Sequence, residues 1–170
     1  TYLHFLPLLR AQLPAGAKLA VTVPVDEEGW PLARFADVTD RVILMAYDQH
    51  WQSGQPGPIA AQDWFTRQVK TALREIGADH IVVALGSYAY DWHGTGDGET
   101  ADALSLDEAW LAAHDSDAPP IYDMASGNAG FAYDEAGQRH QIWMLDAAAT
   151  WNELLVLKRL GIQSMALWRL

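Results

Sequence analysis

Residues 42–51 read VILMAYDQHW, and this stretch combines a buried strand with a polar end. Its first four residues form an unbroken apolar run, as expected for a strand that is covered on both faces. Tyr47 to Trp51 then add a phenol, a carboxylate, an amide, an imidazole and an indole in succession. The pattern predicts a core strand whose carboxyl end carries groups able to bind a ligand.

Three further apolar runs have the same character, and helical periodicity separates them. The predicted strands are 18–25, 41–47, 80–87 and 164–168. The predicted helices are 1–13, 32–37, 62–76, 106–113 and 147–160. Alternation of strands and helices is typical of an α/β fold with a parallel sheet. The sheet is either doubly wound or part of a (β/α) barrel.

The segment before the last helix breaks this alternation. Short strands are predicted at 121–124, 130–134 and 140–145, and EAGQ at 135–138 forms a turn between the last two. Residues 92–100 are rich in glycine and are predicted to be a loop. We therefore expect one domain, 1–170, with a small β-hairpin insert at about 119–145.

The composition excludes several classes of function. Half of the 170 residues are apolar, which is typical of a folded domain. The formal net charge of -11 would repel a phosphate backbone, so nucleic acid is not an expected partner. The absence of cysteine excludes disulfides and thiolate metal ligands. No apolar run approaches the roughly 20 residues of a membrane span.

The carboxyl ends of the predicted strands collect aromatic and polar residues, and ligands bind at this edge in parallel α/β folds. These residues are Asp26, Tyr47 to Gln49 with Trp51 beyond, Tyr88 to Trp92, and Trp168. Indole faces stack on sugar rings, while phenols, carboxylates and amides form hydrogen bonds with sugar hydroxyls, so the pattern favours a carbohydrate. The structural alternatives are a core role for Tyr88 and Trp168, and a loop-anchoring role for Trp51. The six histidines lack metal-ligand spacing, so neither a metal nor another cofactor is expected.

Several segments, taken in chain order, carry a family resemblance. MAYD at 45–48, VALGSYAYDW at 83–92, FAYD at 131–134 with the strand after it, and ALW at 166–168 resemble glycoside hydrolase family 18, the chitinase-like TIM barrels. The resemblance implies the carboxyl-terminal part, about strands 5 to 8, of a (β/α)8 barrel. The loop GQPGPIAAQDWF at 54–65 resembles bacterial members that are fused to polysaccharide deacetylase or glycosyltransferase domains.

The resemblance also implies roles for individual residues. In family 18 the N-acetyl group of the substrate is itself the nucleophile, and a glutamate is the general acid. Tyr47 would donate a hydrogen bond to the acetamide, Asp48 would hold a sugar hydroxyl, and Trp168 would lie under the sugar. Tyr88, Trp51 and Gln49 are further candidates for substrate binding. The motif Asp-x-x-Asp-x-Asp-x-Glu, which contains the general acid, does not occur in this chain. By alignment it would fall before Thr1, so this chain alone is expected to be inactive.

Three functions are compatible with these observations. The first is part of a hydrolase that acts on β-1,4-linked N-acetylglucosamine polysaccharide or chito-oligosaccharide, in an extracytoplasmic or membrane-tethered bacterial protein. The second is a non-catalytic, lectin-like domain in a polysaccharide-modifying protein. The third is a doubly wound nucleotide-binding domain, but the segment DEEGWP after Val25 has three acids and one glycine, which argues against it. A half barrel would also expose two sheet edges, so we expect self-association.

Overall fold

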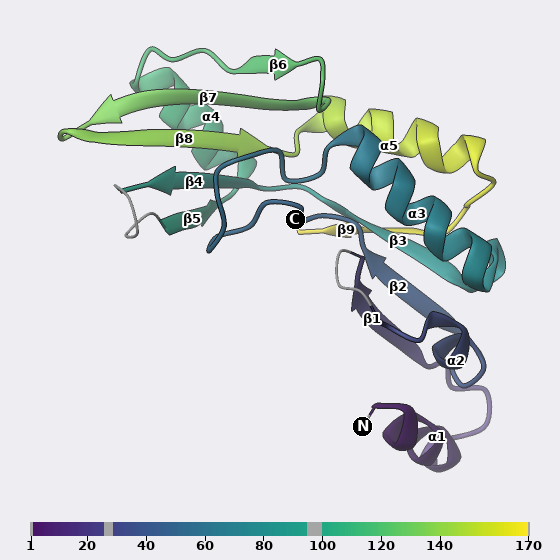
Figure 1. The fold of residues 1–170 in the computed structure, drawn as a ribbon. Coiled ribbons are helices and arrows are strands. Elements are labelled where there is room, and N and C mark those ends of the chain that lie inside the picture. The colour runs from purple at the N-terminus through teal and green to yellow at the C-terminus, as the bar shows by residue number, and fades with distance from the viewer. Residues whose placement is uncertain (1, 26–28, 95–99, 170) are drawn as a thin grey trace.

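A computed structural model describes residues 2–25, 29–94 and 100–169, and it contains two sheets (Figure 1). The helices are α1 Tyr2–Gln12, α2 Leu32–Ala36, α3 Gln62–Ile76, α4 Leu106–Asp115 and α5 Ala147–Arg159, with a 3-10 turn at Ala78–His80. The strands are β1 Ala20–Pro24, β2 Arg41–Met45, β3 Ile81–Gly86, β4 Ala89–His93, β5 Thr100–Leu104, β6 Ile121–Asp123, β7 Asn128–Glu135, β8 Gln138–Met144 and β9 Met165–Trp168. The predicted mixed α/β fold is confirmed.

The first sheet is parallel, with the strand order β1-β2-β3-β9. Val21, Val42 and Ile81 stand in one register row and are buried. Since side chains alternate across a strand, this row and its i+2 neighbours share one face. Helices α3 and α5 run side by side along the sheet and pack against each other and against β3 (Figure 1). The core therefore lies between the sheet and these helices.

The opposite face of the parallel sheet is less covered. Ile43 and Val82 share a register row on this face and are only half-buried, and Thr22 beside them is exposed. The edge strands β1 and β9 pair with no further strand in the part of the chain that the structure describes. The sheet is accordingly open, and these residues form no closed barrel.

The second sheet is antiparallel, with the order β5-β4-β8-β7-β6. Helix α4 packs on one of its faces, where Ala109 and Ala113 join Phe131 and Ile142 in a small core. The prediction of a loop over 92–100 is wrong at its ends, because Trp92 and His93 belong to β4 and Thr100 begins β5. The sheet thus starts at Ala89, earlier than the expected start of the insert. Residues 95–99 lie outside the described part.

The connection from β2 to α3 runs beside the second sheet (Figure 1). The Asn128 side chain, which is fully buried, joins the two through paired hydrogen bonds: Ala60 N–H donates to Oδ1 at 3.1 Å, and Nδ2 donates to the Ala60 carbonyl at 2.9 Å. Trp92 Nε1 also donates to the Gly54 carbonyl at 3.1 Å. These bonds hold the connection, and the polar residues at its start, in a defined place.

Local signals explain where the helices begin and end. Ser105 and Glu108 form a capping box at the start of α4, and Asp146 accepts hydrogen bonds from the amides of Ala148 and Ala149 at the start of α5. Helix α3 ends at Gly77, whose φ of 72° favours glycine. None of the helices over the described residues is both long and apolar enough to cross a bilayer.

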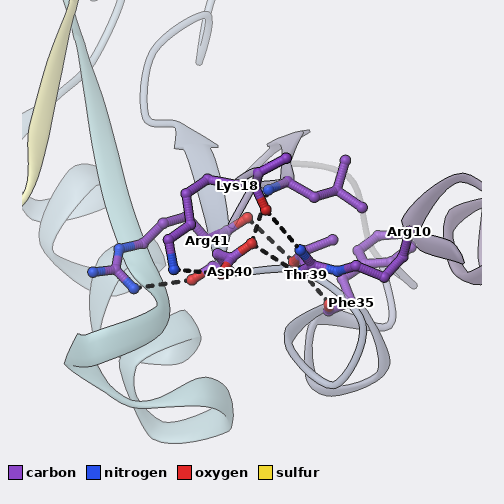
Figure 2. A network of polar contacts seen from close by, with 8 residues as sticks. Arg10, Lys18, Phe35, Thr39, Asp40 and Arg41 are labelled. Carbon is purple, nitrogen blue, oxygen red and sulfur yellow. Dashed lines mark hydrogen bonds and ion pairs between the residues drawn. The ribbon is translucent and has the colours of Figure 1, made fainter. Parts of the chain in front are cut away.

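A polar network lies at the amino end of the parallel sheet (Figure 2). Asp40, just before β2, accepts hydrogen bonds from Arg10 Nη2 at 2.7 Å, Lys18 Nζ at 3.1 Å and Leu19 N–H at 2.8 Å. Thr39 Oγ1 donates to the Phe35 carbonyl at 2.8 Å. The network ties α1 and α2 to the starts of β1 and β2.

Candidate functional site

The turn that follows β2 places Tyr47 and Asp48 at the carboxyl edge of the parallel sheet. Ala46 N–H donates to the Ala84 carbonyl at 3.1 Å, which extends the pairing with β3. Gln49 N–H donates to the Ile59 carbonyl at 2.8 Å. Asp48 lies between these two anchors with a φ of 65°, in the left-handed region that Asp adopts more readily than most residues. Its backbone is therefore held from both sides.

Two tyrosines from the next part of the chain meet the Asp48 carboxylate. The hydroxyls of Tyr88 and Tyr90 both donate to Asp48 Oδ1, the latter at 3.0 Å. Both phenols are buried, with 6% and 7% of each residue exposed. Within the described chain, these are the hydrogen bonds to this carboxylate, and Oδ2 accepts none.

Ring packing and one glycine place the tyrosines. Tyr47, Tyr88, Tyr90 and Trp92 form a series of edge-to-face contacts, with successive ring centroids 5.8, 5.2 and 5.4 Å apart. A Cβ on Gly86 would lie 2.9 Å from the Tyr88 ring and 2.4 Å from Leu145 Cδ1. The close approach at the end of β3 thus requires glycine.

The electrostatics keep these phenols protonated. Burial, with the negative charge of Asp48 as a smaller cause, raises the pKa of Tyr47 to about 12. The same two causes, burial first, raise the pKa of Tyr88 and of Tyr90 further. All three are neutral hydrogen-bond donors at physiological pH.

A small hollow of about 130 Å³ adjoins this carboxylate. It is lined by Asp48, Tyr88, Tyr90, Ala103, Trp168 and Arg169. Trp168 stands beside Gly86 in the strand register and is 56% exposed, so its indole is open to a ligand. The hollow therefore offers a carboxylate acceptor and an aromatic surface together.

Two predicted site residues, Gln49 and Trp51, do not line this hollow. The side-chain oxygen of Gln49 accepts a hydrogen bond from Ala61 N–H at 2.9 Å, so the amide helps to hold the loop before α3. Trp51 is 54% exposed on that loop and does not line the hollow. The structure thus brings together Asp48, Tyr88 and Trp168 with Tyr47 in contact, but not Gln49 or Trp51.

The expectation that Asp91 and Trp92 belong to the same polar edge is wrong. Asp91 is next to Tyr90 in β4, and neighbouring side chains of a strand point to opposite faces of the sheet. Its carboxylate therefore lies on the other face of the second sheet, where it contacts His140 Nδ1 at 2.9 Å. Trp92 is buried under the β2–α3 connection. Asp26 lies outside the described residues.

Ala103 and Arg169 were not predicted at this edge, and Tyr90 was predicted only as one of the aromatic residues at the strand ends, without a role of its own. Tyr90 had a usable signal, because it is two residues from Tyr88 in an extended segment and so shares its face. Ala103 comes from β5, whose pairing was not predicted. Arg169 follows Trp168 through a cis peptide bond.

Larger hollows exist elsewhere, but none of the described residues that line the two largest is a predicted site residue. One of about 740 Å³ lies between α4 and the β7–β8 hairpin, and one of about 390 Å³ lies between the end of β1 and α3. Over the described residues, no group of three or more His, Asp or Glu side chains is arranged to hold a metal ion. The chemistry of the Asp48 hollow, rather than its size, makes it the candidate site.

Comparisons with known proteins agree with this fold. No protein-family model matches the chain. The chain is 28% identical over 136 residues to YvbX, an uncharacterized glycosylase of Bacillus subtilis. The aligned region covers 74% of this chain and 39% of the relative. The crystal structure of the spore cortex-lytic enzyme SleL of Bacillus cereus matches with a TM-score of 0.88 at 26% identity, over 99% of this chain and 41% of that one.

A chitinase from Chromobacterium violaceum matches equally well. Its TM-score is 0.87 at 28% identity, over 99% of this chain and 56% of the chitinase. The chain spans about two fifths of the length of the curated relatives that it matches. The same fold thus recurs within longer glycosidases from several bacteria.

Proposed function

We propose that this chain, which belongs to the chitinase-like glycoside hydrolases of family 18, forms the sugar-binding part of a glycosidase active site. The observation that carries the proposal is the hollow in which Asp48, two buried phenols and the exposed Trp168 meet at the carboxyl edge of a parallel sheet. The ligand class is a β-1,4-linked N-acetylglucosamine polysaccharide or oligosaccharide.

Each side chain has a defined part in binding such a ligand. Asp48, an acceptor, would take a hydrogen bond from a sugar hydroxyl or amide through Oδ2. Tyr47, kept neutral by its raised pKa, would donate to the acetamide carbonyl. The Trp168 indole would stack against the sugar ring. These contacts would hold the N-acetyl group in place for attack on its own anomeric carbon, the substrate-assisted route.

The chain does not carry the general acid of that route. It contains no Asp-x-x-Asp-x-Asp-x-Glu segment, and general acid catalysis contributes roughly 10²- to 10⁴-fold to a rate. In our proposal, residues 1–170 are one partial domain, the carboxyl-terminal half of a (β/α)8 barrel with its β insert. The open sheet and the share of the relatives that is covered support this view. The proposed setting is a bacterial extracytoplasmic or membrane-tethered protein.

Calorimetric titration with chitotetraose tests the proposal. We expect saturable binding by the chain and about tenfold weaker binding by Trp168→Ala, because the variant loses the stacking surface. Trp151→Ala is the matched control, since Trp151 is also exposed, at 63%, but lies on α5 and does not line the hollow. No binding by the unaltered chain, or equal losses in both variants, would contradict the proposal.

The alternative is a non-catalytic, lectin-like domain, and the same contacts support it. The two differ in the general acid. Reading the gene upstream of the Thr1 codon separates them: an intact Asp-x-x-Asp-x-Asp-x-Glu supports a hydrolase, and a motif without its Glu supports a lectin.

The open sheet also supports a second copy of the chain as a partner. Both edge strands run parallel to their neighbours, and Met165 and Leu167 on β9 are 43% and 44% exposed. Pairing of β9 in one copy with β1 in the other would cover these edges. We expect a dimer by multi-angle light scattering, and a monomer that persists at high concentration would contradict this.

A further inference from the structure

One oxygen of the Asp48 carboxylate receives two hydrogen bonds, and the other receives none from the described residues. Tyr88 and Tyr90 both donate to Oδ1. Both residues come from the β3–β4 segment, some forty positions further along the chain, whereas Asp48 belongs to the turn after β2. The contact therefore crosses from the parallel sheet to the antiparallel one.

We propose that Tyr88 and Tyr90 are positioning residues, which hold Asp48 Oδ1 so that Oδ2 is presented as a single acceptor to the ligand in the hollow. This rests on the proposed function and assigns Tyr88 a role different from direct contact with sugar. Tyr90 is assigned to the site because its hydroxyl is the second donor to Asp48 Oδ1.

The surroundings of the three residues make the arrangement rigid. The Asp48 backbone is anchored by the Ala46 and Gln49 amides, in a left-handed conformation that few residues adopt. The two tyrosine rings are buried and pack edge to face at 5.2 Å, so neither hydroxyl can move far. With Oδ1 fixed by two donors, rotation of the carboxylate would break both bonds at once.

The choice of phenols rather than cations has a chemical consequence. A neutral hydroxyl orients a carboxylate without cancelling its charge, so Oδ2 stays a strong acceptor. Hydrogen bonds to a charged group are roughly twice as strong as neutral ones. The site would therefore favour a ligand that presents a hydroxyl or amide hydrogen at one defined place, and disfavour an anionic group there.

The first test needs no ligand. A crystal structure of the Tyr88→Phe/Tyr90→Phe variant removes both hydroxyls and keeps both rings. We expect the Asp48 carboxylate to turn or to occupy more than one orientation. An unchanged, single orientation of Asp48 would overturn the proposal, whatever the variant binds.

The second test measures affinity for chitotetraose in a double-mutant cycle. We expect Tyr90→Phe to weaken binding about three- to tenfold in the unaltered chain. In an Asp48→Ala background the same substitution should have an effect within about twofold, because the residue acts through Asp48. Equal losses in both backgrounds would show that Tyr90 acts independently of Asp48, and would overturn the proposal.

Tyr133→Phe is the matched control. Tyr133 lies on the same antiparallel sheet, but its hydroxyl faces Asp91 at 3.5 Å rather than Asp48. Loss of this hydroxyl should therefore leave both readouts unchanged.

The experiments distinguish failure of the proposed function from failure of the positioning role. An unaltered chain that binds no chitotetraose contradicts the proposed function, while the crystal structure still decides the positioning role. Binding that is insensitive to Tyr90→Phe contradicts the positioning role alone.

Discussion

Asp40 and Asp48 lie at opposite ends of β2, and their partners differ in kind. Asp40, at the amino end, accepts hydrogen bonds from two cations, Arg10 and Lys18, and from a backbone amide (Figure 2). Asp48, beyond the carboxyl end, accepts from two neutral phenols. One strand thus separates a carboxylate that is paired with cations from one whose hydrogen-bond donors are neutral.

The difference shows what each end of the sheet does. The Leu19 amide first, and then Arg10 and Lys18, hold the pKa of Asp40 well below its usual value, so this carboxylate stabilises the fold. In our proposal, the Asp48 carboxylate at the other end is oriented by neutral donors and is available to a ligand. Parallel α/β folds commonly divide in this way, with stabilising contacts at the amino edge and binding groups at the carboxyl edge.

The largest expected effect separates the two aspartates by affinity. Asp48→Ala should weaken chitotetraose binding by about 10- to 100-fold, because hydrogen bonds to charged groups contribute roughly 1.5–3 kcal/mol. Asp40→Ala should leave the affinity unchanged, since it lies at the far edge. Calorimetric titration of both variants checks this, and a similar loss in both would remove the distinction between the two ends.

A third carboxyl, Glu153, sharpens the comparison because the described part of the chain offers it neither a cation nor a neutral donor. It is fully buried on α5, and neither of its oxygens has a hydrogen-bond partner among the residues that the structure describes. Burial raises its pKa well above 4.5. Since the folded pKa exceeds the unfolded one, its contribution to stability is greatest below about pH 4.5 and is lost as the pH rises through the folded pKa.

Glu153→Leu should therefore raise the free energy of unfolding at pH 7 by about 1–3 kcal/mol, the usual cost of an unsatisfied buried polar group. The gain should shrink at pH 4, where the unfolded chain no longer gains by ionising Glu153. Urea denaturation at the two pH values measures this difference. A gain that does not depend on pH would mean that packing, and not ionisation, is responsible.

The smallest expected effect concerns Asp40 and acid. Its folded pKa is depressed, so its contribution to stability is present above the unfolded pKa of about 3.8 and is lost as the pH falls through the folded pKa. Asp40→Asn should lower the melting temperature slightly at pH 7 and not at the acid end. Added salt should reduce the difference, because the ion pairs are partly exposed. Calorimetric melts at two pH values and two salt concentrations test this.

Much of the fold was predictable from local pattern. Helix α3 runs from Gln62 to Ile76, as predicted, because a strong helical period ends at Gly77. The four apolar runs of the parallel sheet are confirmed as strands to within a few residues. The expectation that both faces of the sheet are covered is not met, because one face is only partly buried and β9 is exposed. The family resemblance of the MAYD turn and its companion segments agrees with the comparisons.

The site was less predictable, because its contacts are long-range. Sequence pattern placed Tyr47, Asp48, Tyr88 and Trp168 at strand ends, but it did not distinguish a residue that faces the hollow from one that does not. Asp91 and Tyr90 are adjacent in sequence, yet they lie on opposite faces of β4. The glycine-rich sequence after His93 predicted a loop. Trp92 and His93 form part of a strand only because β4 pairs with β5 and β8.

The sequence by itself determined the helices, the four strands of the parallel sheet, the apolar core and the polar carboxyl end of β2, because periodicity and side-chain chemistry are local properties. Only the tertiary structure decided that two phenols converge on one oxygen of Asp48, and that the Gln49 oxygen is taken up by the Ala61 amide. The first pairing depends on how the two sheets are set against each other, and the second depends on how the connection from β2 to α3 folds back on itself. No local pattern encodes that arrangement, because it is fixed by packing between residues far apart in the chain.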